Sequence, residues 1–500
     1  MFESFAEGLG NILLLQALTV IVLGTLIGTI VGILPTMGGL EVMGLMLVFI
    51  LYIPPEVGLL LLIAMVGVTE TGGSITSILL NIPGTAINAA TVIDGFPMTQ
   101  KGHASRAVGA ALTASVFGGV AAVFLAFLMV PMVIPLVLAM RVGDISIMVL
   151  LGMTLLATLT TGSVFKGLIA GFLGMFVSLI GVYLPTGTER FAFGTVYLYD
   201  GLSIVPVVVG LFGIGTLLDT ISRGESSLAS GLSKTRFSDI LVGAKDVLQK
   251  WWLWLRCTVL GYFIGVIPGV GASVATFTAY GYAKQVSKHP EEFGKGNVEG
   301  VIAPESANNA KEAGGLLTTL AFGLPGSASM AIFLAALYAV DVVPGPSMLL
   351  TNLQMVFYLL MGVGISQVTA GVFCFAGAPW LIKAAYTPMR FLFPLIMVLI
   401  FVGCFAERIT MAGVGVAIIF GVLGFIMARL EYSRPAFVLG FVLAGLFEEN
   451  LFLALKTAGP FFFTTPISLV FIALIVVMFS LPTIKNIFAG RSVKVSHYEI

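Results

Sequence analysis

The chain has 500 residues, of which 58% are hydrophobic and only 10% are charged. A water-soluble domain of this length would need many more polar residues on its surface, so this composition excludes a soluble globular protein. The 24 basic and 24 acidic residues cancel, and this balance gives no reason to expect a nucleic acid as partner. We therefore expect a protein that lies mostly within a lipid bilayer.

Apolar runs separated by short polar stretches continue from about residue 9 to about residue 482. In lipid every backbone polar group must be satisfied within the protein, which favours helices. At roughly 20 residues per span, the runs predict about ten to twelve transmembrane helices plus shorter re-entrant hairpins. The predicted fold class is an all-α polytopic membrane protein.

Residues 1–218 contain two interruptions by proline and glycine inside apolar sequence. The first is Gly28–Gly38, which includes Pro35, and the second is Asn81-Ile-Pro-Gly-Thr85. Proline removes a backbone donor and glycine tolerates left-handed angles, so each interruption ends one helix and lets another begin. The freed backbone groups are tolerated at membrane depth only inside protein or along a polar cavity. We interpret 1–218 as a first repeat with broken-helix motifs.

Residues 219–250 are polar and rich in serine and glycine, and they lead into three tryptophans that begin at Trp251. Basic residues gather here and in the C-terminal tail, whereas residues 1–100 contain no lysine or arginine. The positive-inside rule therefore predicts that the 219–250 linker and the C-terminus face the cytoplasm and that the N-terminus does not. Residues 237–255 fit an interfacial helix, with a loop before an ordinary helix as the alternative.

Residues 251–349 repeat the motifs of the first part. Gly261–Gly271 matches Gly28–Gly38 in Gly, Gly, Pro and Gly at the same offsets, and Glu312-Ala-Gly-Gly with Gly323-Leu-Pro-Gly-Ser327 matches the stretch from Glu70 to Thr85. Paired broken segments in two halves are the best sequence indication of a transporter's binding site. Kinks that merely allow close helix packing are the alternative, and the duplication argues against them.

Residues 350–500 form a run of ordinary apolar spans without counterparts of these motifs, and we assign them to a scaffold or partner surface. The three cysteines and three histidines are widely separated. This spacing predicts no disulfide, zinc or haem site, and we expect no cofactor. The only metal that the sequence suggests is sodium.

The start of a half-helix offers N–H donors and partial positive charge to a carboxylate, whereas freed carbonyls and amides suit a hard cation such as sodium. Glu70 and Glu312 occupy equivalent positions, and an ionisable residue in a span predicts function unless it lies at the interface as a hydrogen-bond acceptor. Asn308 and Asn309 suit both ligands, with a helix cap or a loop as the alternative. The predicted substrate site comprises Thr36, Gly38, Asn81, Pro83, Gly84, Thr85, Asn88, Ser273, Asn308, Asn309, Pro325, Gly326 and Ser327. The predicted ion site comprises Gly38, Asn81, Gly271, Ser273, Ser329, Glu70 and Glu312.

Several long motifs occur in an order that resembles the large membrane subunit of the tripartite tricarboxylate transporters. They are Gly73–Thr85, Ala90–Met98 with Lys101-Gly102, Ala303-Pro-Glu-Ser-Ala-Asn-Asn-Ala310 and Gly323–Ser327. The family usually has glycine after the proline of the first motif, whereas this chain has Thr36. A β-branched residue is poorly suited to a positive φ, so either the turn differs here or Thr36 contributes a hydroxyl group.

The resemblance implies a permease subunit in the bacterial inner membrane that imports organic di- or tricarboxylates, driven by a sodium or proton gradient. It further implies a periplasmic solute-binding protein, a small membrane subunit of about four spans, and kinship with elevator-type carriers. In such carriers two hairpin tips and two broken helices meet near the midplane, here at Gly32–Gly39, Asn81–Asn88, Ile267–Ser273 and Gly323–Ser329.

The residues alone leave two other functions open, although we expect no enzymatic activity. One is a passive anion channel. The other is an intramembrane aspartyl protease, which Gly143-Asp144 and Tyr199-Asp200 weakly suggest, in an order reversed from that of such enzymes. The sequence also leaves a homo-oligomer open.

Overall fold

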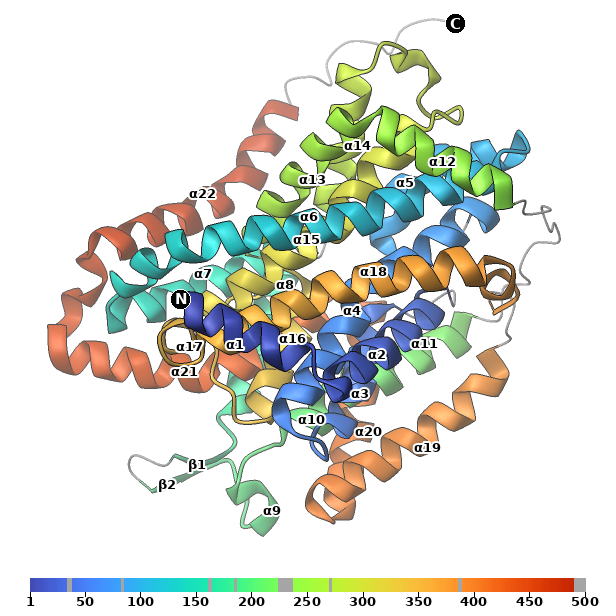
Figure 1. Ribbon diagram of the computed structural model, residues 1–500. Helices are drawn as coiled ribbons and strands as arrows, with labels where there is room; N and C mark the ends of the chain where they lie inside the picture. Colours follow the sequence, from blue (N-terminus) through green and yellow to red (C-terminus); the bar gives the residue numbers. More distant parts are fainter. Residues whose placement is uncertain are drawn as a thin grey trace, which may run out of the picture.

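The computed structural model describes residues 1–33, 38–81, 85–160, 164–183, 187–223, 237–268, 272–384 and 389–489. Helices make up nearly all of these residues (Figure 1). In the first half they are α1 (Phe2–Ile12), α2 (Leu15–Ile33), α3 (Gly39–Ile50), α4 (Pro55–Leu80), η1 (Ala86–Asn88), α5 (Ala89–Gln100), α6 (Ala104–Leu138), α7 (Val142–Thr160), α8 (Val164–Ser178), α9 (Val196–Tyr199), α10 (Ile204–Val208), the π-helix η2 (Val209–Ile214) and α11 (Gly215–Arg223). In the second half they are α12 (Phe237–Gln249), α13 (Trp251–Val266), α14 (Ala272–Val286), η3 (Pro290–Glu292), α15 (Glu299–Phe322), α16 (Ala328–Ala339), α17 (Pro346–Thr351), α18 (Leu353–Ala384), α19 (Met389–Arg408), α20 (Met411–Arg429), α21 (Arg434–Ala458), η4 (Gly459–Thr464) and α22 (Pro466–Ala489).

Six helices among the described residues are long and apolar enough to cross a membrane. Shorter apolar helices of 10–17 residues accompany them, including α3, α13 and α16. Strands β1 (Gly181–Tyr183) and β2 (Thr188–Arg190) form one small antiparallel hairpin, in which Gly181 pairs with Arg190. The protein is an all-α polytopic membrane protein, which confirms the predicted fold class.

Glycines let α2 and α4 pack backbone against backbone. A Cβ atom added at Gly24 would meet Leu61, one at Gly28 would meet Met65, and one at Gly32 would meet Thr69. Both series ascend in steps of four residues, so the two helices run parallel. Helix α3 runs in the opposite direction, because Gly39 lies beside Thr69 whereas Ile50 lies beside Gly58. Helices α2 and α3 therefore form an antiparallel hairpin.

Helices α13 and α15 repeat this packing in the second half. Gly261 lies against Ala307 and Gly265 lies against Lys311, again with both series ascending, so these helices are also parallel. On α15, Gly314 packs against the backbone carbonyl of Tyr262 of α13. The aligned glycines of the two halves thus make equivalent backbone contacts.

Helices α4 and α15 end in the same way at the two Pro-Gly motifs. Asn81 ends α4 with a φ of 58°, and Gly323 ends α15 with a φ of 66°, both in the left-handed region. Asparagine is among the few residues other than glycine that tolerate this conformation. Asn81 therefore ends the helix through its backbone conformation, and the residue is exposed.

The two long broken helices cross in opposite directions. Asn309 of α15 donates to Thr71 of α4 at 2.8 Å, and Ser74 of α4 donates to Glu305 of α15 at 2.7 Å. One residue number rises as the other falls, so α4 and α15 are antiparallel. Each hairpin also reaches the opposite half, since α14 contacts η1 and α5, whereas α16 contacts α3 and α4. The two motif sets are related as an inverted repeat.

Packing partners divide the remaining helices into two groups. The long helices α6 and α18 run side by side against α4 and α15 (Figure 1), while α12 packs on α6 and α1 packs on α18. Helices α7, α8, α10, α11, α20 and α21 and the π-helix η2 pack mainly on one another. Helices α3 and α16 are the main contacts between the two groups. The residue boundaries assigned from sequence to the domains remain predictions, and residues 237–249 are a helix rather than a loop.

Asp94 of α5 ties the two halves together on the side where α15 begins. Its Oδ1 accepts hydrogen bonds from the backbone N–H groups of Gly294 at 2.9 Å, Gly296 at 2.7 Å and Asn297 at 2.9 Å. Its Oδ2 accepts from the Tyr280 hydroxyl at 2.9 Å. One buried carboxylate thus organises the loop that leads into α15.

Gly32→Ala is expected to destabilise the fold, because the added Cβ would press into the carbonyl oxygen of Thr69. Overpacking of this kind costs about 1–3 kcal/mol. A lowered melting temperature of the purified full-length protein would show it. Gly10→Ala is the matched control, since nothing lies within 4 Å of its new Cβ. Equal melting temperatures for the two variants would contradict the proposed packing.

Asp94→Ala is expected to loosen the 294–297 loop, because three backbone donors would lose their acceptor. Each buried donor left without a partner costs about 1–3 kcal/mol. Limited trypsin digestion should then cut faster after the exposed Lys295. Tyr280→Phe removes only one of the four hydrogen bonds and should change the cutting rate little. Similar rates for the two variants would argue against this role of Asp94.

Candidate functional site

The two tips and two breaks lie around the crossing of α4 and α15. Gly38, at the end of the first tip, lies beside Thr85, since a Cβ atom added at Gly38 would be 3.3 Å from the Thr85 methyl group. In the second half Gly326 packs against Gly315 and the carbonyl oxygen of Gly265. Each tip is therefore next to the Pro-Gly break of its own half. Four predicted site residues lie outside the described residues, namely Thr36, Pro83, Gly84 and Gly271.

The start of α5 is held by a small network of hydroxyl and amide groups. The Thr85 hydroxyl donates to Glu70 and lies 2.9 Å from Oδ1 of Asn88. Nδ2 of Asn88 donates to the Glu70 carbonyl and to Oγ of Ser74, each at 3.0 Å. The structure thus brings together three predicted residues, Glu70, Thr85 and Asn88.

The start of α16 is capped by Ser327, whose hydroxyl accepts from the backbone N–H of Met330 at 3.3 Å. Pro325 and Gly326 are buried in the turn before it, and Ser329 is buried in the first turn of the helix. Two helix N-termini, those of η1–α5 and α16, therefore follow the two breaks. Ser273 is half-buried at the start of α14, where its carbonyl oxygen accepts from Thr276.

Glu70 and Glu312 lie inside the protein rather than at its surface. Their exposed fractions are 5% and 2%, so other protein surrounds both side chains. The alternative, a structural hydrogen-bond acceptor at the membrane interface, concerns depth in the bilayer and stays a prediction. Glu312 forms an ion pair with the adjacent Lys311, itself 3% exposed, while Oε2 of Glu312 has no hydrogen-bond partner among the described residues. Buried charges require a partner. Lys311 pairs with one oxygen of the Glu312 carboxylate, and the other oxygen is left without a hydrogen bond from the described residues.

Asn308 and Asn309 lie in the middle of α15, fully buried, so they are neither a helix cap nor part of a loop. Nδ2 of Asn309 donates to Thr71 and to Gln367 of α18 at 2.6 Å. The side-chain oxygens of both asparagines have no hydrogen-bond donor within the described part of the chain. These two oxygens are free to accept from a ligand or to coordinate a cation.

The sequence interpretation did not include Glu305, Lys311 or Gln367 in the site. Glu305, Asn308, Asn309 and Glu312 recur at helical spacing, so they share one face of α15. That spacing of polar residues within an otherwise small-residue helix was the signal that could have identified Glu305. Its partners come from α4, α5 and α6 and could not be read from local sequence.

The two aspartates that suggested a protease have different surroundings. Asp144 is buried and accepts from the backbone N–H of Arg141 at 2.8 Å and from Ser468 at the start of α22. Asp200 ends the short helix α9 and is exposed. Asp144 therefore acts as a helix-capping and loop-closing carboxylate.

Comparisons with known proteins agree with this architecture. The profile of the tripartite tricarboxylate transporter TctA family matches residues 18–439. A protein of Agrobacterium vitis, described as an uncharacterized 52.8 kDa protein in the TAR-I ttuC' 3' region, is 32% identical over 469 residues, which are 93% of each chain. An uncharacterized protein in the TAR-II ttuC' 3' region of the same organism is 32% identical over 232 residues, 45% of this chain and 96% of its own. No solved structure matches the chain. The match over most of its length shows that this chain belongs to the TctA family of tripartite tricarboxylate transporters.

Proposed function

We propose that the protein is the carrier subunit of a secondary transporter that imports organic di- or tricarboxylates into a bacterial cell. Membership of a tripartite family supports the existence of partner subunits. We assign to it a periplasmic solute-binding protein that delivers the substrate and a small membrane subunit. The carrier lies in the inner membrane, with residues 219–250 and the C-terminus in the cytoplasm, and acts without enzymatic chemistry.

The observation that carries this proposal is the pair of helix N-termini beside the α4–α15 crossing. Each follows a left-handed residue and a proline, and each presents a hydroxyl residue, Thr85 or Ser327. Helix N-termini provide N–H donors and partial positive charge, which suit a carboxylate. Two such sites related by the inverted repeat suit a substrate with two or more carboxylates. Gly38, Asn81, Asn88 and Ser273 contribute the surrounding backbone and polar groups.

The excess of buried glutamates over buried lysines on α4 and α15 supports a coupling cation. Three glutamates, Glu70, Glu305 and Glu312, are buried on α4 and α15 together with one buried lysine, Lys311. Carboxylates in a medium of low dielectric constant are costly unless a cation or a proton offsets them. Import driven by a sodium or proton gradient would meet this requirement, with ligands drawn from Glu70, Glu312, Ser329 and the freed backbone near Gly271.

The contacts between the two helix groups support movement of an elevator type. The group that contains both broken helices touches the other group mainly through α3 and α16, which are short and lie next to the breaks. We propose that this group slides against α7, α10, η2 and α21 and exposes the site to each side in turn. A carrier of this kind catalyses counterflow of labelled carboxylate, whereas a passive channel does not.

Gly326→Ala is expected to abolish uptake while leaving insertion into the membrane intact. The added Cβ would lie 2.5 Å from the Cα of Gly315 and 2.6 Å from the carbonyl oxygen of Gly265, so the α16 N-terminus must shift. Counterflow in proteoliposomes would measure the loss, which we expect to exceed about tenfold, since a small displacement of binding groups is costly. Gly281→Ala, with nothing within 4 Å of its new Cβ, is the matched control. Wild-type counterflow by Gly326→Ala would refute this location of the substrate site.

A further inference from the structure

Glu305 is a fully buried carboxylate with a complete shell of hydroxyl groups. Its Oε1 accepts from Ser74 of α4 at 2.7 Å and from Thr91 of α5, and its Oε2 accepts from Ser115 of α6 at 2.7 Å. Each of these side chains is at most 1% exposed. Three helices of the first half thus direct oxygen atoms at one carboxylate of the second half.

The hydroxyl groups around Glu305 suit an ionised carboxylate, because each of them can donate to one of its oxygens. Both oxygens accept from hydroxyl groups, and a proton on either oxygen would compete with those donors. No basic side chain pairs with Glu305 in the described ranges, since the ammonium group of Lys311 pairs with Glu312. A negative charge buried at this depth therefore lacks a counter-charge.

Asn308 supplies a second, independent indication of a ligand. It lies one turn after Glu305 on the same face of α15, is fully buried, and its side chain faces the Glu305 carboxylate. The side-chain oxygen of Asn308 accepts no hydrogen bond from any described residue. A buried asparagine whose oxygen has no donor is a costly arrangement unless that oxygen has another partner.

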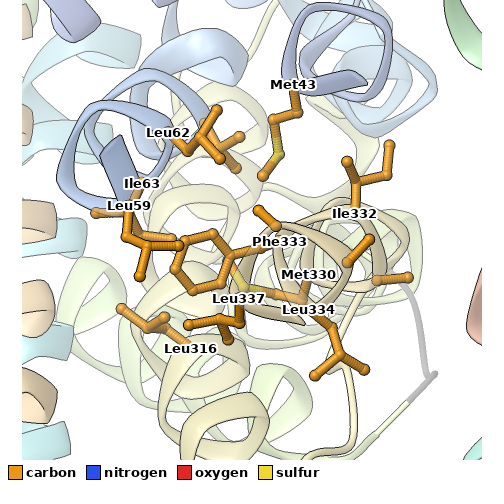
Figure 2. Close-up of a cluster of buried hydrophobic side chains, with 14 of the residues drawn as sticks. Met43, Leu59, Leu62, Ile63, Leu316, Met330, Ile332, Phe333, Leu334 and Leu337 are labelled. Atoms are coloured by element: carbon orange, nitrogen blue, oxygen red, sulfur yellow. The ribbon is translucent and has the colours of Figure 1, made fainter. Parts of the chain in front are cut away.

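The other half of the inverted repeat shows that the fold does not need polar groups here. Aligning Glu70 with Glu312 places Ile63 opposite Glu305, Leu316 opposite Ser74, and Phe333 opposite Thr91. Figure 2 shows Ile63, Leu316 and Phe333 packed in one buried apolar cluster between α4, α15 and α16. The same position in the architecture is thus filled with hydrocarbon in one half and with oxygen atoms in the other.

We propose that Glu305, Ser74, Thr91, Ser115 and Asn308, the Glu305 cage, bind one sodium ion. The cage offers only oxygen ligands, as a hard cation prefers, and no nitrogen or sulfur ligand that would favour a transition metal. The hydroxyl groups would turn their hydrogens away and coordinate through their lone pairs. A single carboxylate matches a monovalent ion in charge, whereas calcium sites usually collect several carboxylates.

The cage is connected to the proposed substrate site by a continuous chain of hydrogen bonds. Ser74 bonds to Glu305 at 2.7 Å, Asn88 bonds to Ser74 at 3.0 Å, and Thr85 bonds to Asn88 at 2.9 Å. Sodium in the cage would draw Ser74 into coordination and thereby fix Asn88 and the start of α5. In this respect the inference rests on the proposed function, because it assigns the coupling cation of carboxylate import to the cage in place of the ligands suggested above around Glu312 and Gly271.

The thermal stability of the purified full-length protein tests sodium binding without any substrate. A ligand that binds only the folded state raises the melting temperature in proportion to the logarithm of its concentration above Kd. We expect a rise when NaCl replaces KCl at constant ionic strength, and no such rise for Glu305→Gln. An equal melting temperature in both salts, or a sodium response retained by Glu305→Gln, would overturn the proposal, as would stabilisation by acid in place of sodium.

Ser115→Ala keeps the Glu305 carboxylate, so this variant tests the cage if Glu305→Gln does not fold. It should raise the sodium concentration at half-effect by about tenfold, the loss expected for one hydrogen-bonding or coordinating group beside a charge. Thr113→Val is the matched control on α6, because among the described residues the Thr113 hydroxyl bonds only to its own helix, donating to the Gly109 carbonyl oxygen at 2.8 Å. Equal midpoints for Ser115→Ala and the wild type would contradict the cage.

Uptake measurements separate failure of the cage from failure of the proposed function. A sodium response that depends on Glu305, in a protein that shows no counterflow with any di- or tricarboxylate, would uphold the cage and refute carboxylate transport. Sodium-driven uptake that survives Glu305→Gln with an unchanged sodium midpoint would uphold transport and refute the cage.

Discussion

A peptide group that leaves its helix at membrane depth has no water to bond, and the rest of this structure depends on meeting that constraint. Two long helices, α4 and α15, end at left-handed residues, Asn81 and Gly323, each followed by a Pro-Gly motif in the sequence. Protein surrounds the second break, where Gly323, Pro325 and Gly326 are buried, whereas Asn81 at the first break is exposed. Backbone contacts through glycine bring α2 onto α4 and α13 onto α15, so each hairpin tip lies beside a break. The same glycine contacts thus allow close helix packing and position the candidate site.

The duplicated motifs could be recognised from sequence because they depend on local chemistry. Proline and glycine have fixed backbone effects wherever they occur, and Glu70 and Glu312 align through the glycines that follow them. The breaks at Asn81 and Gly323 were therefore predictable. The antiparallel crossing of α4 and α15 was not, since it depends on which helices pack together across a long stretch of intervening chain.

The candidate site was predicted in part for the same reason. Thr85, Asn88 and Ser327 lie next to the breaks in sequence, and they lie there in the structure. Glu305 was missed because its hydrogen-bond partners, Ser74, Thr91 and Ser115, belong to three other helices. A carboxylate between an alanine-proline pair and two asparagines does not by itself indicate such a shell. Tertiary contacts alone distinguish it from an ordinary helix-surface glutamate.

The inverted repeat is symmetric in backbone and asymmetric in chemistry. Gly28 and Gly32 have equivalents in Gly261 and Gly265, because the contact geometry leaves no room for a side chain at these positions. Where side chains are free to vary, the two halves differ. Lys311 occupies the position that Thr69 has in the first half, and Met330 occupies the position that Asn88 has there. Under the proposed function, a substrate with two similar carboxylates would need two similar backbone sites, whereas a coupling cation would need only one. The proposed cation site accounts in this way for the asymmetric placement of polar groups around Glu305.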